Sequence, residues 1–153
     1  MQSNATAKIK SERRKLIAVA IAAAILLFFA FSFFATSSVV SLVLGQKVYY
    51  LQTARTEAQR EKGLGNRNNM PSNEGMLFIY GNMGKRCFWM KDMSFSLDMI
   101  WVDNGKHITH IEHNVTPDTY PDKTFCAFAQ DVIELPAGVA DQYHLALGQT
   151  LTF

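Results

Sequence analysis

The feature that most constrains this chain is an uninterrupted apolar run near its amino terminus. Residues 16–35 contain no charged side chain and a single hydroxyl, that of Ser32. As a helix rising about 1.5 Å per residue, this run would span roughly 30 Å, the thickness of the hydrocarbon core of a bilayer. A helix of a soluble core would show polar residues at helical spacing, and none appear in this run. The run therefore predicts one transmembrane helix that precedes the folded domain.

The charges on either side of the run predict its orientation. Residues 1–15 carry five cations and one acid, Glu12, whereas residues 36–46 carry no charge. By the positive-inside rule, residues 1–15 would be a cytoplasmic tail and residues 16–35 a signal anchor, with the remaining chain outside the cell membrane. An alternative stays open, a signal peptide cleaved near Ala35-Thr36-Ser37, which would make the domain secreted. Both alternatives predict export.

The charge balance of the exported part argues against a nucleic-acid partner. After residue 15 the chain has ten lysines and arginines against twelve aspartates and glutamates. Such a weakly acidic domain lacks the basic surface that phosphate backbones require. The sequence also contains no glycine-rich phosphate loop and no familiar nucleophile motif. We therefore expect no nucleic acid, no cofactor and no metal as a partner.

Beyond residue 46 the chain changes to short β-type runs separated by turn residues. Thr56 and Gln59 form a capping box, which predicts a helix over residues 57–62 that ends at Gly63. Pro136 predicts a second short helix over residues 136–142. The predicted strands cover residues 48–51, 76–80, 88–90, 97–102, 107–115, 131–135 and 150–153.

This pattern predicts a mostly β fold, a small antiparallel sandwich or barrel with two short helices. Asp103-Asn104-Gly105-Lys106 is a hairpin signal that joins residues 97–102 to residues 107–115, with positive φ expected at both central turn positions, Asn104 and Gly105. Residues 36–46 read as a stalk or a first strand. Residues 47–153 would then form the extracytoplasmic β domain.

Two cysteines, Cys87 and Cys126, lie in the exported part, where oxidising conditions allow a disulfide. In the chain-entropy account, closing a loop of this length could stabilise the fold by roughly 4 kcal/mol. Spacing alone does not show that the two sulfurs meet, so a catalytic thiol stays open as the alternative. The chain has no Cys-x-x-Cys motif, which leaves thiol exchange without support.

Asp98 carries the strongest site signal, because this carboxylate interrupts an otherwise apolar strand. A buried charge needs a partner or a pocket mouth, and Lys91 is the nearest candidate partner. Glu74 and Glu112 are further carboxylates near strand ends. Together these four side chains could bind a polar ligand or perform acid–base chemistry. The alternative is a structural ion pair between strands.

Aromatic and histidine side chains offer weaker signals. Trp89 could stack against a sugar or a cation, although aromatic residues in strands are usually core. His107, His110 and His113 recur every third residue, but in a strand His110 faces away from the other two. Three converging metal ligands are therefore not expected.

Three segments with defined spacing resemble a known family. They are Glu74-Gly75-Met76-Leu77-Phe78, Phe88-Trp89-Met90-Lys91 and Leu97-Asp98-Met99-Ile100. This pattern is similar to the domain of unknown function 192 family, also called uncharacterised protein family 0127. Residues 56–64 and residues 133–138, which include Glu134, Pro136 and Gly138, extend the resemblance over about residues 48–153.

The resemblance implies a compact, mostly β, jelly-roll-like fold that is often exported behind a signal or anchor helix, and it implies no established activity. The chain departs from the family pattern at Gly65 and Asn66, at Asp92 and at Ser96. The resemblance also selects Lys91 and Asp98, which strengthens the case for a polar site that contains both.

Three classes of function remain open from the sequence. The first is a membrane-anchored domain of the cell envelope that binds a small polar or carbohydrate-like ligand, or an envelope partner, through Glu74, Trp89, Lys91, Asp98 and Glu112. The second is an envelope enzyme, hydrolase-like in its acid–base chemistry, with Asp98 or Glu74 as base and Lys91 as electrostatic stabiliser. The third is a purely structural or assembly module.

Overall fold

The computed structural model describes residues 13, 15–21, 23 and 38–153. The chain divides into two units, residues 1–37 and residues 38–153. Residues 13, 15–21 and 23 are helical, whereas most of the predicted tail (1–15) and of the predicted transmembrane helix (16–35) lies outside the described residues. Within the described part of the chain, no helix has both the length and the hydropathy needed to cross a bilayer.

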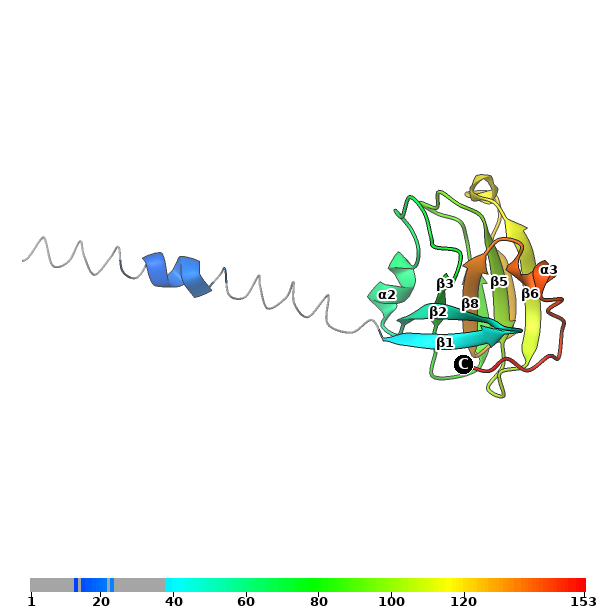
Figure 1. Cartoon of the computed structure of the whole chain (residues 1–153). Coiled ribbons are helices and arrows are strands. Elements are labelled where there is room, and N and C mark those ends of the chain that lie inside the picture. Colours follow the sequence, from blue (N-terminus) through cyan, green and yellow to red (C-terminus); the bar gives the residue numbers. More distant parts are fainter. Residues whose placement is uncertain (1–12, 14, 22, 24–37) are drawn as a thin grey trace, which may run out of the picture. The chain divides into compact units, whose positions relative to one another are not determined.

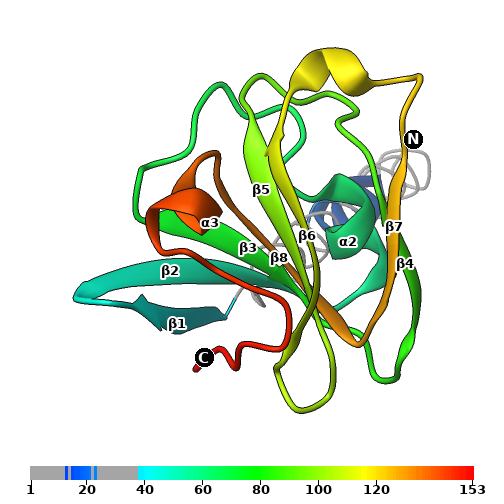
Figure 2. The same ribbon diagram turned by 90° about the vertical axis from the view of Figure 1, so that its right-hand side faces the viewer.

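The second unit is mostly β, as predicted, and consists of two sheets (Figures 1 and 2). The strands are β1 (Val39–Leu44), β2 (Lys47–Ala54), β3 (Glu74–Phe78), β4 (Gly84–Phe88), β5 (Leu97–Val102), β6 (Ile108–Val115), β7 (Phe125–Ala129) and β8 (Asp131–Pro136). The helical elements are α2 (Glu57–Lys62), the 3₁₀ turn η1 (Pro117–Thr119) and α3 (Val139–Gln142).

Six strands form the main sheet in the order β1-β2-β3-β8-β5-β6, and β4 pairs with β7 in a separate two-stranded ribbon. The pair β2–β3 is parallel, whereas every other strand pair is antiparallel. The parallel pair requires a crossover, which α2 and the following loop provide. The arrangement is thus two sheets rather than a closed barrel.

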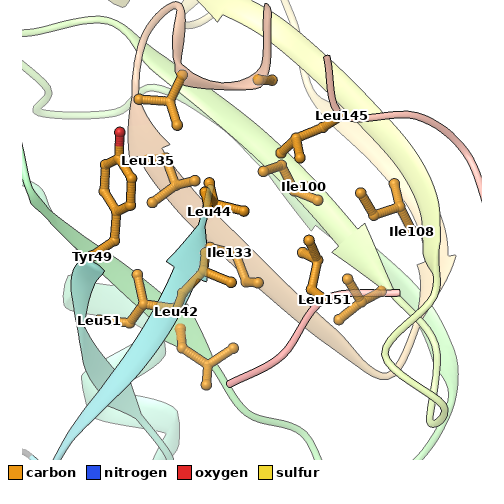
Figure 3. Close-up of a cluster of buried hydrophobic side chains, with 14 residues drawn as sticks. Leu42, Leu44, Tyr49, Leu51, Ile100, Ile108, Ile133, Leu135, Leu145 and Leu151 are labelled. Atoms are coloured by element: carbon orange, nitrogen blue, oxygen red, sulfur yellow. The ribbon is translucent and has the colours of Figure 1, made fainter. Parts of the chain in front are cut away.

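The main sheet buries both of its faces, which explains why its central strands are apolar throughout. In β5, Leu97, Met99 and Trp101 join one core cluster, whereas Ile100 and Val102 join the other. Figure 3 shows the cluster on the second side, where Leu42 and Leu44 of β1 meet Ile100, Ile133 and Leu135. In Figure 2, α3 and the C-terminal segment lie on one side of the central strands, and α2, β4 and β7 on the other.

Several local predictions agree with the structure. Helix α2 covers Glu57–Lys62 and has the complete capping box between Thr56 and Gln59. Gly63 follows it with a φ of 47° and donates its N–H to the carbonyl of Gln59. The hairpin between β5 and β6 also forms. The positive φ expected at Asn104 and Gly105 is wrong, however: it falls on Lys106 alone in this turn, because residues 103–106 form a turn closed by the Asp103 carbonyl and Lys106 then redirects the chain.

Other local predictions are corrected. Of the two alternatives for residues 36–46, the stalk is wrong and the first strand is right, since residues 39–44 form β1, an edge strand of the main sheet. Strand β4 ends at Phe88, so residues 89–90 lie beyond it, and β7 was not predicted. Pro136 ends β8 rather than opening a helix, and the predicted strand at residues 150–153 is reduced to one bridge between His107 and Thr150.

Candidate functional site

A pocket of about 520 Å³ lies on the side of the main sheet that carries α2 and β4. Its walls come from α2 and the loop that follows it, from the end of β3 and the chain after it, from β4 with the chain after it, and from one residue of β8. The lining residues are Glu57, Arg60, Glu61, Lys62, Gly63, Leu64, Gly65, Phe78, Tyr80, Gly81, Asn82, Arg86, Cys87, Phe88, Trp89, Lys91, Met93 and Glu134.

The apolar part of the pocket is an extension of the core. The rings of Phe78 and Phe88 meet edge to face, with centroids 4.7 Å apart, and Phe88 meets the buried ring of Trp101 in the same way. Such contacts fix the orientation of each ring. The pocket therefore has a rigid aromatic wall below its polar rim.

Tyr80 organises the basic side of the pocket. Its ring contacts two guanidinium groups, with the Cζ of Arg86 3.9 Å and the Cζ of Arg60 4.7 Å from the ring centroid. The Tyr80 N–H donates to the Asp131 carboxylate at 3.0 Å, which fixes the backbone beside the ring. Burial raises the pKa of the Tyr80 hydroxyl, and both arginines oppose that rise. The phenol is therefore neutral at physiological pH.

Glu134 is the one carboxyl group of the pocket that comes from the central sheet. It lies on β8 between Met76 of β3 and Met99 of β5, and only 5% of its surface is exposed. Burial raises its pKa from 4.5 to about 8, and the positive charge of Arg67 opposes this rise only in part. At neutral pH the group is mostly protonated, so it can donate a hydrogen bond as well as accept one.

Two of the predicted site residues, Trp89 and Lys91, line this pocket. Both follow the end of β4, and both are exposed, the indole of Trp89 to 50%. An indole exposed to that degree at a pocket provides a flat surface for a ligand.

Three predicted site residues lie elsewhere. Glu74 begins β3, half-buried and paired with Tyr50, and does not line the pocket. Glu112 of β6 accepts a hydrogen bond from His110, with 2.7 Å between Oε1 and Nε2. The third is Asp98. The predicted cluster of four charged groups is therefore not assembled by the fold.

Asp98 requires the clearest correction. Its side chain is fully buried and faces the side of the sheet opposite the pocket, toward α3. The carboxylate accepts backbone hydrogen bonds from Asn114 at 2.8 Å and from Ala140 at 2.7 Å, and the predicted ion pair with Lys91 does not form among the described contacts. The signal in the sequence was correct in that the charge needed partners, but the partners are main-chain amides.

The same signal could have found Glu134. It interrupts the apolar run of β8 as Asp98 interrupts that of β5, and both sit among buried neighbours. In the sequence, Glu134 stood out only as part of a family pattern. Which side of the sheet faces a pocket depends on long-range packing. The strand sequences alone therefore could not show which of the two carboxyl groups, Asp98 or Glu134, lines the pocket.

Cys87 and Cys126 form a disulfide, and the two residues are directly opposite each other in the β4–β7 register. Cys87 also lines the pocket. The disulfide therefore covalently joins the strand that carries the pocket wall to its neighbour β7.

The three histidines contact three different carboxylates. His107 pairs with Asp103, His110 with Glu112, and His113 with Asp141. Across residues 13, 15–21, 23 and 38–153, no group of three or more histidine, cysteine, aspartate or glutamate side chains is arranged to hold a metal ion.

Comparison with known proteins places most of the chain in one family. The model of the family described as DUF192, Uncharacterized ACR, matches residues 40–153. A search of curated proteins gives no match.

Two solved structures are similar to this chain over most of its length. A "putative transcription regulator" from Sinorhizobium meliloti 1021 is 26% identical, with a TM-score of 0.67 over 76% of this chain and 93% of that one. A protein of unknown function from Novosphingobium aromaticivorans DSM 12444 is also 26% identical, with a TM-score of 0.69 over 78% of this chain and 88% of that one.

Proposed function

The chain belongs to the DUF192 family, and from the pocket of this member we infer that its β domain binds a small polar, carbohydrate-like ligand. One observation carries the proposal: the buried carboxyl of Glu134 and the exposed indole of Trp89 line the same pocket. The bound ligand would contact a hydrogen-bonding group deep in the pocket and a flat apolar surface at its rim.

The size and chemistry of the pocket support this ligand class. A volume of about 520 Å³ lies in the range of pockets that bind small molecules. A sugar presents C–H groups that stack on an aromatic ring and hydroxyls that both donate and accept hydrogen bonds. A protonated Glu134 and the neutral Tyr80 hydroxyl suit such hydroxyls, because each can donate or accept.

We further propose that the domain is tethered to the cell membrane and faces the outside of the cell. The support is the apolar run of residues 16–35 behind the basic residues 1–15. The Cys87–Cys126 disulfide is compatible with an oxidising compartment. The ligand would then be a component of the cell envelope or its surroundings.

Tryptophan fluorescence offers a direct test of ligand binding. The chain has two tryptophans, of which Trp101 is fully buried and Trp89 is half-exposed, so acrylamide quenching reports mainly on Trp89. A panel of neutral and acidic mono- and disaccharides is titrated into the full chain in detergent. We expect at least one saccharide to protect Trp89 from acrylamide.

A matched pair of variants separates stacking from general effects. Trp89→Ala should weaken the affinity of that saccharide about tenfold by calorimetry, which corresponds to the loss of one aromatic contact. Phe128→Ala removes an aromatic side chain that is 63% exposed on β7 and does not line the pocket, so it should leave the affinity unchanged. If no saccharide protects Trp89, or if both variants behave alike, the proposed ligand class is wrong.

The tether has its own test. The full chain with a carboxy-terminal epitope should remain in the membrane pellet after carbonate washing, and an antibody added to intact spheroplasts should reach the epitope. A shorter product in the medium would show that the apolar run is a cleaved signal peptide and not an anchor. Recovery of the full chain in the soluble cell interior would contradict export altogether.

A second candidate, an envelope enzyme, is favoured by the raised pKa of Glu134. A carboxyl group that stays protonated near neutral pH inside a pocket can serve as a general acid. In this alternative Glu134 replaces Asp98 or Glu74 as the reacting carboxyl group, as a general acid instead of the general base first expected, since neither of those residues lines the pocket. Turnover of a cell-wall fragment that Glu134→Gln abolishes, while saccharide protection of Trp89 persists, would establish the enzyme.

A further inference from the structure

Arg86 differs from Arg60, the other arginine of the pocket, in its hydrogen bonding. Arg60 donates to the carbonyls of Arg55 and Ile79 and pairs with the carboxylate of Glu57. In contrast, no carboxylate of the described chain lies within ion-pair distance of Arg86, and its buried Nε has no hydrogen-bond partner there. The Asp131 carboxylate interacts with Arg86 only from beyond that distance. A half-buried guanidinium without a carboxylate in ion-pair contact, beside a pocket, is an arrangement that a bound anion would complete.

The Arg86 side chain is also held in place before any ligand binds. Its guanidinium stacks on the Tyr80 ring, and its Nη2 donates to the side-chain oxygen of Asn82 at 3.0 Å. Gly84 leaves room for the guanidinium, since a Cβ there would lie 3.3 Å from the Arg86 Cζ. The Arg86 carbonyl accepts a hydrogen bond from Trp101 Nε1 at 3.0 Å, which anchors the backbone to the core.

Such fixation has a consequence for affinity. A free arginine loses side-chain entropy when it binds an anion, but a stacked and hydrogen-bonded guanidinium has already lost most of it. The described contacts use Nη2 for Asn82 and give Nη1 no acceptor. The Nη1 group therefore remains available to a ligand in the pocket that Arg86 lines.

The charges around the pocket favour an anion as well. Arg60, Lys62, Arg86 and Lys91 line it, against the carboxyl groups of Glu57, Glu61 and Glu134. Burial raises the pKa of Glu134 to about 8, so at neutral pH that group contributes little negative charge. Glu57 is engaged by Arg60. The residues that line the pocket therefore carry more positive than negative charge.

We propose that the ligand of this pocket carries an anionic oxygen group, a carboxylate or a phosphate, that binds the Nη1 side of Arg86 while the rest of the ligand contacts Glu134 and Trp89. The inference rests on the proposed function and narrows its ligand class to acidic saccharides, either uronates or sugar phosphates. Arg86 would act as the residue that selects acidic over neutral sugars.

Calorimetry at pH 7 on the full chain in detergent tests this selection with matched sugars. The probes are glucose and galactose, their uronates, and glucose 6-phosphate. We expect an acidic sugar to bind at least tenfold more tightly than its neutral counterpart, and the uronate and phosphate arms identify which anion is preferred. Equal affinity for acidic and neutral sugars would overturn the inference and leave the proposed function standing.

Variants of β4 assign the preference to Arg86. Arg86→Gln should reduce the acidic-to-neutral preference to less than threefold while keeping the affinity for the neutral sugar. Lys85→Gln removes a cation from the adjacent, exposed position of the same strand and should leave the preference intact. A preference that survives Arg86→Gln, or that Lys85→Gln removes equally, would overturn the role of Arg86.

Two further measurements keep the outcomes distinct. If Arg86→Gln fails to fold, as judged by circular dichroism, Arg86→Lys keeps the charge but not the planar group, and should lower the preference at least threefold. Inorganic phosphate should raise the Tm of the parent chain more than that of the Arg86 variant even if no sugar binds. If phosphate shows this difference in Tm and no sugar binds, the anion site is supported and the saccharide is rejected. If the Tm does not differ and acidic sugars bind no more tightly than neutral ones, the anion site is rejected.

Discussion

The buried carboxylate of Asp98 accepts a hydrogen bond from the backbone N–H of Ala140, with 2.7 Å between the two atoms. A second bond, from the N–H of Asn114, engages its other oxygen. One side chain of β5 thereby satisfies main-chain donors of both the α3 turn and the end of β6. Free amides at the first turn of a helix need such partners when water cannot reach them.

Asp98→Asn should therefore lower stability rather than ligand binding. The amide keeps one acceptor oxygen, so one buried N–H loses its partner, at a cost of about 2 kcal/mol. Urea unfolding should show this loss, while saccharide protection of Trp89 should persist in the folded variant. Asp122→Asn, at an exposed position, is the control and should change stability by less than about 0.5 kcal/mol. Loss of saccharide binding with unchanged stability would mean that Asp98 takes part in ligand binding after all.

Glu134→Gln should change how stability depends on pH. The Glu134 carboxyl has a pKa of about 8 in the folded chain and ordinarily 4.5. Between these values unfolding releases a proton, so the free energy of unfolding falls as pH rises, by at most about 1.4 kcal/mol per pH unit. The fall ends above pH 8, where both states are ionised.

The glutamine introduced by this substitution would mimic the protonated carboxyl without titrating, so the variant should lose less stability than the parent between pH 5 and pH 8. Urea midpoints measured at each pH unit give the two slopes. The raised pKa of Asp131 contributes a slope of the same sign in both proteins. Parallel curves for parent and variant would contradict the protonated state of Glu134.

Gly75→Ala should be among the most destabilising single changes in the domain. A Cβ at this buried position of β3 would lie 2.4 Å from the carbonyl oxygen of Glu134 and 2.9 Å from Leu51 Cδ2. Because the first contact is with backbone, β3 and β8 must separate, and we expect a loss of about 3 kcal/mol or more. Gly81→Ala, whose Cβ would meet nothing within 4 Å, is the matched control. Thermal unfolding of both variants compares them, and equal Tm values would count against this packing.

Removal of the disulfide should destabilise the domain without changing its fold. The cysteines are 39 residues apart, and the lost loop constraint amounts to about 4 kcal/mol in the chain-entropy account. The double change Cys87→Ser with Cys126→Ser should lower the urea midpoint and leave the far-ultraviolet circular dichroism unchanged. A midpoint equal to that of the parent would mean that β4 and β7 pair firmly without the covalent link.

Sequence patterns correctly predicted the elements that depend on a few neighbouring residues. The Thr56–Gln59 capping box and the apolar run of β5 each depend on a few adjacent residues, and both agree with the structure. Strand β7 was missed because Cys126 and Phe128 are exposed and its pairing with β4 is distant in sequence. The parallel pairing of β2 with β3 is likewise a long-range property that no local run encodes.

The site was predicted in part for the same reason. Trp89 and Lys91 were named, and both line the pocket, whereas Asp98 lies on the opposite side of the sheet. Arg86 and Tyr80 were not named, since an arginine beside a pocket looks like any surface arginine in sequence. Their significance comes from the stacking contact between them, which only the folded chain displays.

The position of β1 has a mechanical consequence. It is the first strand after Ser38, and within the main sheet it pairs with β2 alone. Tension applied to the chain ahead of Ser38 would enter the domain through this edge strand and peel it from β2 before loading anything else. The pocket is built from α2, β3, β4 and β8, so a force that separates β1 from β2 would leave the pocket intact. The β1–β2 hairpin would thus yield first and protect the ligand site from mechanical load.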